Sequence, residues 1–276
     1  MKSNVLMGKI TYINASPVYY GLDHGMLPKW LHLVPDVPAA LNRQIKQGQI
    51  DISPISAAFY AMNHEDLLIL PDLSISCNGE VLSVICASNY PIDELNGKQV
   101  MFSNESASGA SFLKMIFGQR HIVPEFKVGP VGSMDKVADD VDAVMVIGDA
   151  ALTQPWEKRF SYRFDLGKIW YEMTGLPFVF ALWVVRKSFA MKHPDMVEAA
   201  HDLLLSSMTK GYENIEEIVQ DGQQKLGLSH DLIKKYYELL SCDLDPLKVK
   251  AMGMFFDSLY DQGILNQKAQ INFFVP

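Results

Sequence analysis

Polar side chains fall at two points where a predicted strand ends and a predicted helix begins. Residues 9–14 are mainly β-branched and aromatic, and Ser16-Pro17 is typical of an N-cap followed by proline at the first helical position. Asn14 therefore lies at this turn, and Ser56 lies at the equivalent point after a strand at 51–55. Ligands of open α/β sheets bind at the carboxyl ends of strands, so we expect Asn14 to face a crevice. Turn closure by Asn14 and helix capping by Ser56 are the structural alternatives.

A loop of hydroxyl-bearing and small residues lies between a predicted strand at 99–103 and a predicted helix at 111–117. Free backbone N–H groups and the positive end of a helix dipole favour anions at such a place. Ser106, Ala107 and Ser108 are therefore candidates for binding a carboxylate, with plain helix capping as the alternative. The loop lacks the Gly-Lys-Ser/Thr sequence of nucleotide-binding phosphate loops.

Two further polar residues accompany predicted strands. Ser83 interrupts an apolar strand at 81–87, where a hydroxyl can also satisfy itself on the backbone. Asp149 follows Gly148 at the end of a strand at 143–147, and the glycine permits close approach of another group. Capping of the next helix is the favoured interpretation of Asp149.

The elements that position these residues form two lobes in the prediction. Strands and helices alternate from the N-terminus, pause at 88–91, and resume with the strand at 99–103. An apolar strand at 177–186 is long enough to carry the chain back to the first lobe. Helices follow at 195–212, 214–226, 230–240 and 247–262. We therefore expect an α/β fold with one lobe from residues 1–88 together with 184–276, the other from 89–183, and a ligand cleft between them.

Composition excludes several classes of function. The net charge is −8 and only five of the 24 basic residues are Arg, so nucleic acid is not an expected partner. The N-terminus lacks the apolar segment of a signal peptide, and no window approaches the roughly 18 apolar residues of a membrane helix, so we expect a cytoplasmic protein that does not contact a membrane. Cys77, Cys86 and Cys242 fit reduced thiols, and the scattered histidines give little support for a metal site. A monomer and a homodimer are both open.

The sequence resembles the menaquinone-biosynthesis family that has a periplasmic-binding-protein-like fold. The resemblance covers nearly the whole chain in order, and its most specific parts are the YxN motif of the first turn and the segment TGLPFVFALW. Other matching stretches are GKITYINASPVYYGL, VPAALNRQIKQGQIDISPIS, LLILPDLSIS, VLSV, DELNGKQV, the SAS of NESASGASFLK, DAVMVIGDAAL and DLGKIWYEMTGLPFVFALWVVR. It implies a type II fold in which each lobe is a mixed sheet flanked by helices.

The resemblance also implies an activity, the dehydration of chorismate to 3-[(1-carboxyvinyl)oxy]benzoate by a hydro-lyase of the futalosine route, with no metal or organic cofactor. We expect catalytic roles for Asn14 and Ser83. Substrate binding is expected from Ser56, Ser106, Ala107, Ser108 and Asp149. The sister enzyme that forms 1,4-dihydroxy-6-naphthoate is less similar in the first turn. Glu80 and Leu82 stand where the family carries smaller or neutral residues around GPVGS, which leaves substrate details near Ser83 open.

The predicted site contains mostly neutral hydrogen-bonding groups. Loss of the C4 hydroxyl and the C3 hydrogen makes the ring of chorismate aromatic, so the enzyme mainly has to orient the substrate. We expect the enolpyruvyl carboxylate of the substrate to remove the C3 proton, while Asn14 and Ser83 orient it and the departing hydroxyl. The 106–108 loop would anchor a carboxylate, with about 1.5–3 kcal/mol from each charged hydrogen bond.

Two alternatives accompany this mechanism. Asp149 is a rival candidate for the base. A solute-binding or sensor protein for an aromatic or carboxylate ligand is the alternative from another class, because a two-lobed fold does not by itself imply catalysis.

Overall fold

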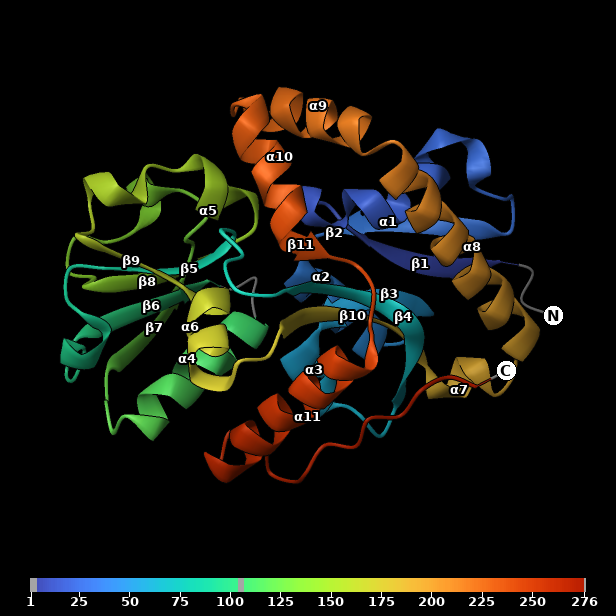
Figure 1. The fold of residues 1–276 in the computed structure, drawn as a ribbon. Helices are drawn as coiled ribbons and strands as arrows, with labels where there is room; N and C mark the ends of the chain where they lie inside the picture. The colour runs from blue at the N-terminus through green and yellow to red at the C-terminus, as the bar shows by residue number, and fades with distance from the viewer. Residues whose placement is uncertain (1–3, 104–106, 276) are drawn as a thin grey trace.

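The computed structural model describes residues 4–103 and 107–275. The strands form two separate mixed sheets, one of six strands and one of five. Figure 1 shows the sheets in two lobes that lie side by side, each with helices packed around its sheet. The α/β fold with two lobes that the sequence predicts is therefore confirmed.

The larger lobe is built on the six-stranded sheet. Its strands are β1 (Val5–Ile10), β2 (Leu31–Asp36), β3 (Ile52–Ser56), β4 (Leu67–Cys77), β10 (Phe178–Arg186) and β11 (Leu240–Ser241), in the order β11-β4-β10-β3-β1-β2. β1 runs parallel to β2 and β3, whereas β10 runs antiparallel to β3 and β4. All of β10 except Arg186 is buried. Helices lie on both faces of this sheet (Figure 1), which explains the unbroken apolar run of β10.

The smaller lobe is built on the five-stranded sheet. Its strands are β5 (Val84–Ser88), β6 (Gln99–Ser103), β7 (Glu125–Gly129), β8 (Ala143–Ile147) and β9 (Tyr162–Asp165), in the order β7-β6-β8-β5-β9. β6 runs parallel to β7 and β8, and β5 runs antiparallel to β8 and β9. The carboxyl ends of β6 and β8 therefore meet at one edge of this sheet, where ligands of such folds bind.

Helices make up most of the rest of the described chain. They are α1 (Ser16–Gly21), α2 (Pro38–Lys46), α3 (Ala57–Met62), α4 (Ala107–Gln119), α5 (Asp149–Thr153), α6 (Leu166–Thr174), α7 (Lys187–Ala190), α8 (Pro194–Glu213), α9 (Ile215–Leu226), α10 (His230–Leu239) and α11 (Pro246–Asp261). Short irregular turns of helix are η1 (Ile13–Ala15), η2 (Leu22–Met26), η3 (Ile92–Glu94), η4 (Met134–Lys136) and η5 (Trp156–Lys158). The four helices predicted after residue 193 are confirmed as α8 to α11.

Several predicted elements differ from the structure. The strand expected at 81–87 begins only at Val84, because a turn precedes it. The long strand β4 was not predicted. β7, β9 and α6 were not predicted. Both strands lie at the edges of their sheet and have exposed residues, so they lack the apolar pattern of the central strands.

The chain changes sheets twice. It leaves the six-stranded sheet after β4 and enters the five-stranded sheet at β5, and it returns between α6 and β10. All residues of β5 pair within the five-stranded sheet, and β10 pairs within the six-stranded sheet from Phe178 onward. The division of the chain into residues 1–88 with 184–276 and residues 89–183 stays a prediction.

An aromatic cluster packs where the chain passes from α6 back to the larger lobe. The ring of Trp170 on α6 lies edge-on to Phe112, Phe178 and Phe255, with centroids 5.7, 5.2 and 6.0 Å away. These rings come from α4, β10 and α11. Trp170 Nε1 also donates to the carbonyl of Pro177 at 2.9 Å. The packing explains why the segment around TGLPFVFALW is rich in large apolar residues.

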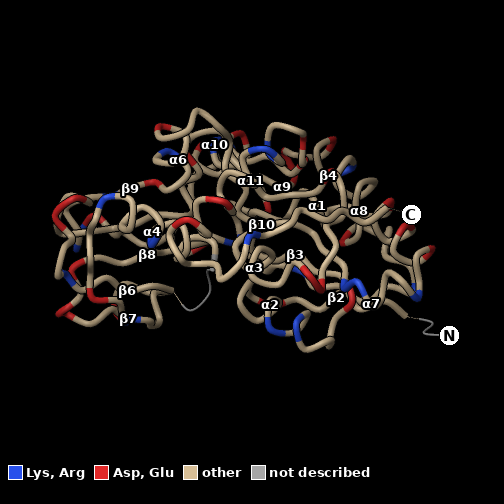
Figure 2. The backbone as a smooth tube through the Cα atoms, turned by 90° about the horizontal axis from the view of Figure 1, so that it is seen from below, with Lys and Arg blue, Asp and Glu red and all other residues tan. Residues whose placement is uncertain are grey.

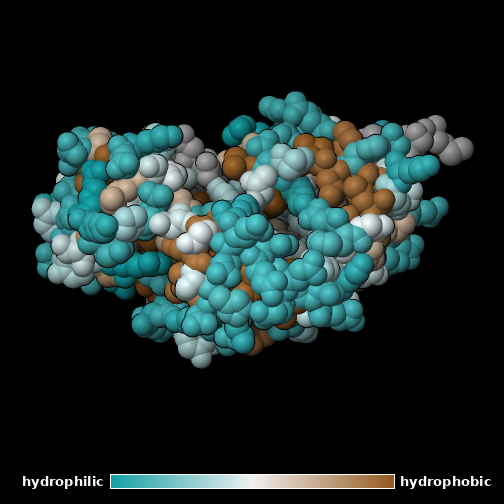
Figure 3. Space-filling model, turned by 90° about the horizontal axis from the view of Figure 1, so that it is seen from above, coloured by the Kyte–Doolittle hydropathy of each residue, from teal (hydrophilic) through white to brown (hydrophobic). Residues whose placement is uncertain are grey.

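Charged residues are distributed around both lobes. Figure 2 shows acidic and basic positions interspersed along the chain, without a continuous basic band on the side in view. Figure 3 shows the opposite side, where most of the surface is hydrophilic and hydrophobic residues gather mainly over the larger lobe. Within the described ranges, no helix combines the length and apolar character needed to cross a bilayer.

Candidate active site

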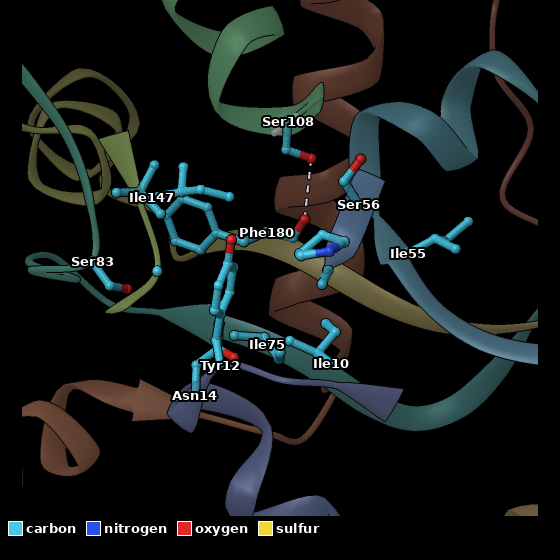
Figure 4. A pocket seen from close by; sticks show the side chains of 14 residues that line it. Ile10, Tyr12, Asn14, Ile55, Ser56, Ile75, Ser83, Ser108, Ile147 and Phe180 are labelled. Atoms are coloured by element: carbon cyan, nitrogen blue, oxygen red, sulfur yellow. Dashed lines mark hydrogen bonds between the residues drawn. The ribbon is translucent and has the colours of Figure 1, made fainter. Parts of the chain in front are cut away.

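A pocket with a cavity volume of about 60 Å³ lies between the two lobes. Its polar lining residues are Tyr12, Asn14, Ser56, Ser83 and Ser108, and Gly148 also lines it. Its apolar walls include Ile10, Ile55, Ile75, Val84, Ile147 and Phe180. Figure 4 shows the ring of Tyr12 extending between the apolar residues of the two lobes. The pocket is therefore an apolar cleft with a few polar groups, as is usual for sites that bind small molecules.

Asn14 lies in the short η1 turn that follows β1, and its side chain lines the pocket. Its Oδ1 atom is buried and has no hydrogen-bond partner among the described residues. A buried amide oxygen without a partner is costly, so a bound molecule that donates to it would be favoured. Turn closure alone therefore leaves this oxygen without a partner among the described residues, and the role of Asn14 in binding stays a prediction.

Groups from distant parts of the chain hold this turn in place. The carbonyl of Ile13 accepts a hydrogen bond of 2.9 Å from Tyr237, and the carbonyl of Thr11 accepts one of 2.6 Å from Lys225. The amide of Ile13 donates to Asp149 at 3.1 Å. Tyr237 and Lys225 come from α10 and α9, which the sequence predicted only as helices. No local signal could have identified these contacts.

Ser83 lies in a tight turn just before β5 rather than within the strand. The turn places Leu82 at a φ of 61°, a conformation that few residues other than glycine adopt. The carboxylate of Asp165 accepts from the amides of Val81 at 3.1 Å and Leu82 at 2.7 Å, which stabilises the turn. Among the described residues, no backbone group is hydrogen-bonded to the hydroxyl of Ser83. This hydroxyl accepts a hydrogen bond of 2.9 Å from Tyr236.

Ser56 and Ser108 line the pocket with hydroxyls that already have partners. Ser56 caps α3 by accepting from the amide of Phe59 at 3.3 Å, so its capping alternative is confirmed. Ser108 accepts from the amide of Ala58 at 3.0 Å and donates to the carbonyl of Phe180 at 3.1 Å (Figure 4). Because Ser108 is on α4, these bonds link the smaller lobe to the larger one.

The predicted anion loop also contains Ser106 and Ala107. Ser106 lies outside the described residues. Ala107 is the first residue of α4.

Asp149 lies beside the pocket and does not line it. The expectation that it caps the following helix is wrong, because Gly148 is the N-cap of α5 and Asp149 makes no capping bond. Its carboxylate accepts from Ile13 of the other lobe and lies 3.3 Å from the ammonium of Lys225. Burial raises the pKa of Asp149, and the hydrogen bond from Ile13 opposes that shift.

Gly148 allows the close approach expected at the end of β8. Its backbone has a φ of 64° and a ψ of −146°, a combination that is essentially restricted to glycine. A Cβ atom at this position would lie 2.7 Å from carbon atoms of the Tyr12 ring. The glycine therefore permits Tyr12 to extend into the pocket.

The polar groups of the pocket are neutral, and none of its described lining residues carries a charge. Buried tyrosines stand behind it, and burial raises the pKa of both Tyr236 and Tyr237, so both remain hydrogen-bond donors. No cluster of three or more His, Cys, Asp or Glu in the described part of the chain is arranged to hold a metal ion. Such a site can orient a compact molecule by hydrogen bonds and exclude water from it.

The fold and the site define a class of protein. Two mixed α/β sheets with a pocket between them match the solved structure of a protein from Archaeoglobus fulgidus, with a TM-score of 0.74, 16% identity, and coverage of 95% of this chain and 99% of that one. A Candida albicans protein described as having the generic periplasmic binding protein fold matches with a TM-score of 0.66 and 11% identity over 99% and 98% of the two chains. The chain thus has a periplasmic-binding-protein-like fold.

Sequence similarity then gives the family. A sequence model described as menaquinone biosynthesis matches residues 5–261, so the chain belongs to this family. It is 26% identical to the chorismate dehydratase of Thermus thermophilus over 84% of this chain and 86% of the relative. It is 30% identical to the chorismate dehydratase of Campylobacter jejuni over 64% and 66% of the two chains. The family resemblance seen in the sequence is confirmed.

Proposed function

We propose that this protein is a chorismate dehydratase, a hydro-lyase that converts chorismate to 3-[(1-carboxyvinyl)oxy]benzoate and water. The observation that carries the proposal is the similarity to the Thermus thermophilus enzyme, which extends over most of both chains. The pocket supports it, because apolar walls suit a carbocyclic ring and neutral donors suit oxygen substituents.

The positions of the pocket residues suggest different catalytic and binding roles for them. Asn14 and Ser83 lie on opposite lobes, so a substrate between them contacts both when the cleft is closed. We assign them the catalytic roles of orienting the ring hydroxyl and the enolpyruvyl carboxylate. Ser56, whose hydroxyl accepts a hydrogen bond as the cap of α3, is assigned to donate to a substrate carboxylate. Binding by Ser106, Ala107 and Ser108 stays a prediction, because the Ser108 hydroxyl already donates to Phe180. Direct binding of substrate by Asp149 stays a prediction, since that residue lies beside the pocket.

The chemistry requires no strong base from the protein. The enolpyruvyl carboxylate takes the proton from C3, and the electron pair of the C3–H bond forms the new double bond to C4. The C4–O bond breaks with its electron pair on oxygen, and the abstracted proton joins the departing hydroxide to give water. Ser83 and Asn14 stabilise the developing charges by hydrogen bonds. Neither residue loses a proton over the reaction.

The test is direct conversion of the substrate. Purified protein, treated with a chelator, is mixed with chorismate, and products are followed by chromatography and mass spectrometry against a sample without protein. We expect a product lighter by one water that retains the enolpyruvyl group. Chorismate that stays unchanged and raises the Tm of the protein would instead indicate a solute-binding or sensor protein, and the proposal would be wrong.

A further inference from the structure

The buried side chain of Tyr236 contacts Ser83 on the side away from the pocket. Tyr236 belongs to α10, which lies between the two lobes in Figure 1, and its side chain is 1% exposed. Its hydroxyl oxygen is 2.9 Å from Ser83 Oγ, although the two residues are 153 positions apart in the sequence. Only the folded arrangement of the helices brings them together.

The direction of this hydrogen bond follows from the acidity of the two groups. A phenol is a much stronger acid than an aliphatic alcohol, so Tyr236 donates and Ser83 Oγ accepts. Burial raises the pKa of Tyr236 above its ordinary value of 10, which keeps the phenol protonated. Ser83 must then direct its own proton away from Tyr236. Within the described residues, no hydrogen bond uses that proton, and Ser83 lines the pocket.

The backbone of Ser83 is fixed independently of its side chain. Its carbonyl accepts a hydrogen bond of 2.8 Å from the amide of Gly148, and its amide donates to the carbonyl of Val81 at 2.7 Å. The remaining freedom of the residue is the rotation of its hydroxymethyl group among three staggered rotamers. The hydrogen bond from Tyr236 favours one of these rotamers.

We propose that Tyr236 is a positioning residue for the dehydration: it holds Ser83 Oγ as an acceptor, so that the Ser83 hydroxyl donates into the pocket toward the hydroxyl that leaves from the substrate. This inference rests on the proposed function. Tyr236 contacts Ser83 and is not itself among the residues that line the pocket. A hydrogen bond donated to Ser83 also polarises the serine hydroxyl and makes it a better donor.

The first measurement compares Tyr236→Phe with the unchanged protein by steady-state turnover of chorismate. Phenylalanine keeps the ring and removes only the donor, so we expect kcat to fall about tenfold with KM changed less than about twofold. The matched control is Tyr60→Phe. Tyr60 is equally buried and bonds to Gln270 and Asn272 away from the pocket, so its loss should leave kcat and KM unchanged.

A double-mutant cycle separates positioning from general packing. If Tyr236 acts through Ser83, adding Tyr236→Phe to Ser83→Ala should lower kcat less than about twofold further. Equal losses in both backgrounds would overturn the inference. If Ser83→Ala has no measurable turnover, the single variant decides: an unchanged kcat, or a rise in KM that accounts for the loss, overturns it.

Turnover of chorismate by the unchanged protein distinguishes failure of the proposed function from failure of the role of Tyr236. Failure of the unchanged protein to convert chorismate overturns the proposed function, and the inference about Tyr236 with it. Conversion by the unchanged protein together with additive losses in the cycle overturns only the role of Tyr236.

Discussion

The carboxylate of Asp149 accepts a hydrogen bond of 3.1 Å from the backbone amide of Ile13. Asp149 begins α5 on the smaller lobe, whereas Ile13 belongs to the turn after β1 on the larger lobe. The bond therefore crosses the cleft. Because Asn14 follows Ile13 directly, Asp149 helps to set the orientation of Asn14 without lining the pocket itself.

This arrangement predicts that Asp149→Asn retains activity. An asparagine carbonyl can still accept from Ile13, and the lost ion pair with Lys225 contributes little because that ammonium is half exposed. We expect kcat for chorismate within about tenfold of the unchanged protein. Asp149→Ala, which removes the acceptor, should lose more. Complete inactivity of a folded Asp149→Asn protein would support Asp149 as the base instead.

The same residue predicts a dependence of stability on pH. Burial raises the pKa of Asp149 in the folded protein, so the folded state keeps a proton over a range in which the unfolded chain has released it. Its stabilising contribution is then fully present below about pH 3.9, the unfolded pKa, and is lost as the pH rises through the folded pKa.

Thermal unfolding of Asp149→Asn and of the unchanged protein between pH 3 and 7 checks this sign. Asparagine has no proton to release. The Tm of the unchanged protein should therefore fall relative to the Tm of Asp149→Asn as the pH rises. If the Tm of the unchanged protein instead rises relative to that of Asp149→Asn, the interactions of Asp149 with Ile13 and Lys225 outweigh the effect of burial on its pKa.

Asn14 should be far less tolerant of change. Asn14→Asp removes the two amide donors and sets a carboxylate beside the carboxylates of the substrate. We expect kcat/KM for chorismate to fall by about 100-fold or more, the usual effect of removing one positioned donor. Asn266→Asp makes the same change at an exposed position and serves as the control. An Asn14→Asp protein with unimpaired turnover would contradict the catalytic assignment.

Local signals were sufficient for part of the site. The proline and serine after residue 14 indicated the turn from strand to helix, and Ser56 at the end of β3 is both a helix cap and a pocket residue. These features depend on the preferences of a few neighbouring residues for caps and turns, which the sequence displays directly.

The rest of the site depends on contacts between distant segments. The partner of Ser83 is 153 positions away, and the partner of Asp149 is 136 positions away. The turn at Leu82 was also missed, because a leucine with positive φ carries no sequence signal. The carboxylate of Asp165 stabilises it through the amides of Val81 and Leu82.

Substitution of Gly148 tests backbone strain and pocket shape separately, because Tm reports the strain and KM reports the pocket. Gly148→Ala forces a side chain into a backbone conformation that costs roughly 1–3 kcal/mol. The new methyl group would also meet the ring of Tyr12 at 2.7 Å and displace it within the pocket. We therefore expect both a lower Tm and a KM for chorismate raised at least about fivefold, which corresponds to roughly 1 kcal/mol of binding.

Two other glycines of the smaller lobe supply controls for this pair of effects. Gly97 also has a positive φ, of 67°, but a Cβ there would meet no atom within 4 Å, so Gly97→Ala should lower Tm and leave KM unchanged. Gly132 has neither a positive φ nor a close neighbour, so Gly132→Ala should change neither quantity. If Gly148→Ala lowers Tm as Gly97→Ala does and leaves KM unchanged, contact with Tyr12 does not shape the pocket. A raised KM in Gly148→Ala alone means that this glycine keeps room in the pocket for the ring of Tyr12.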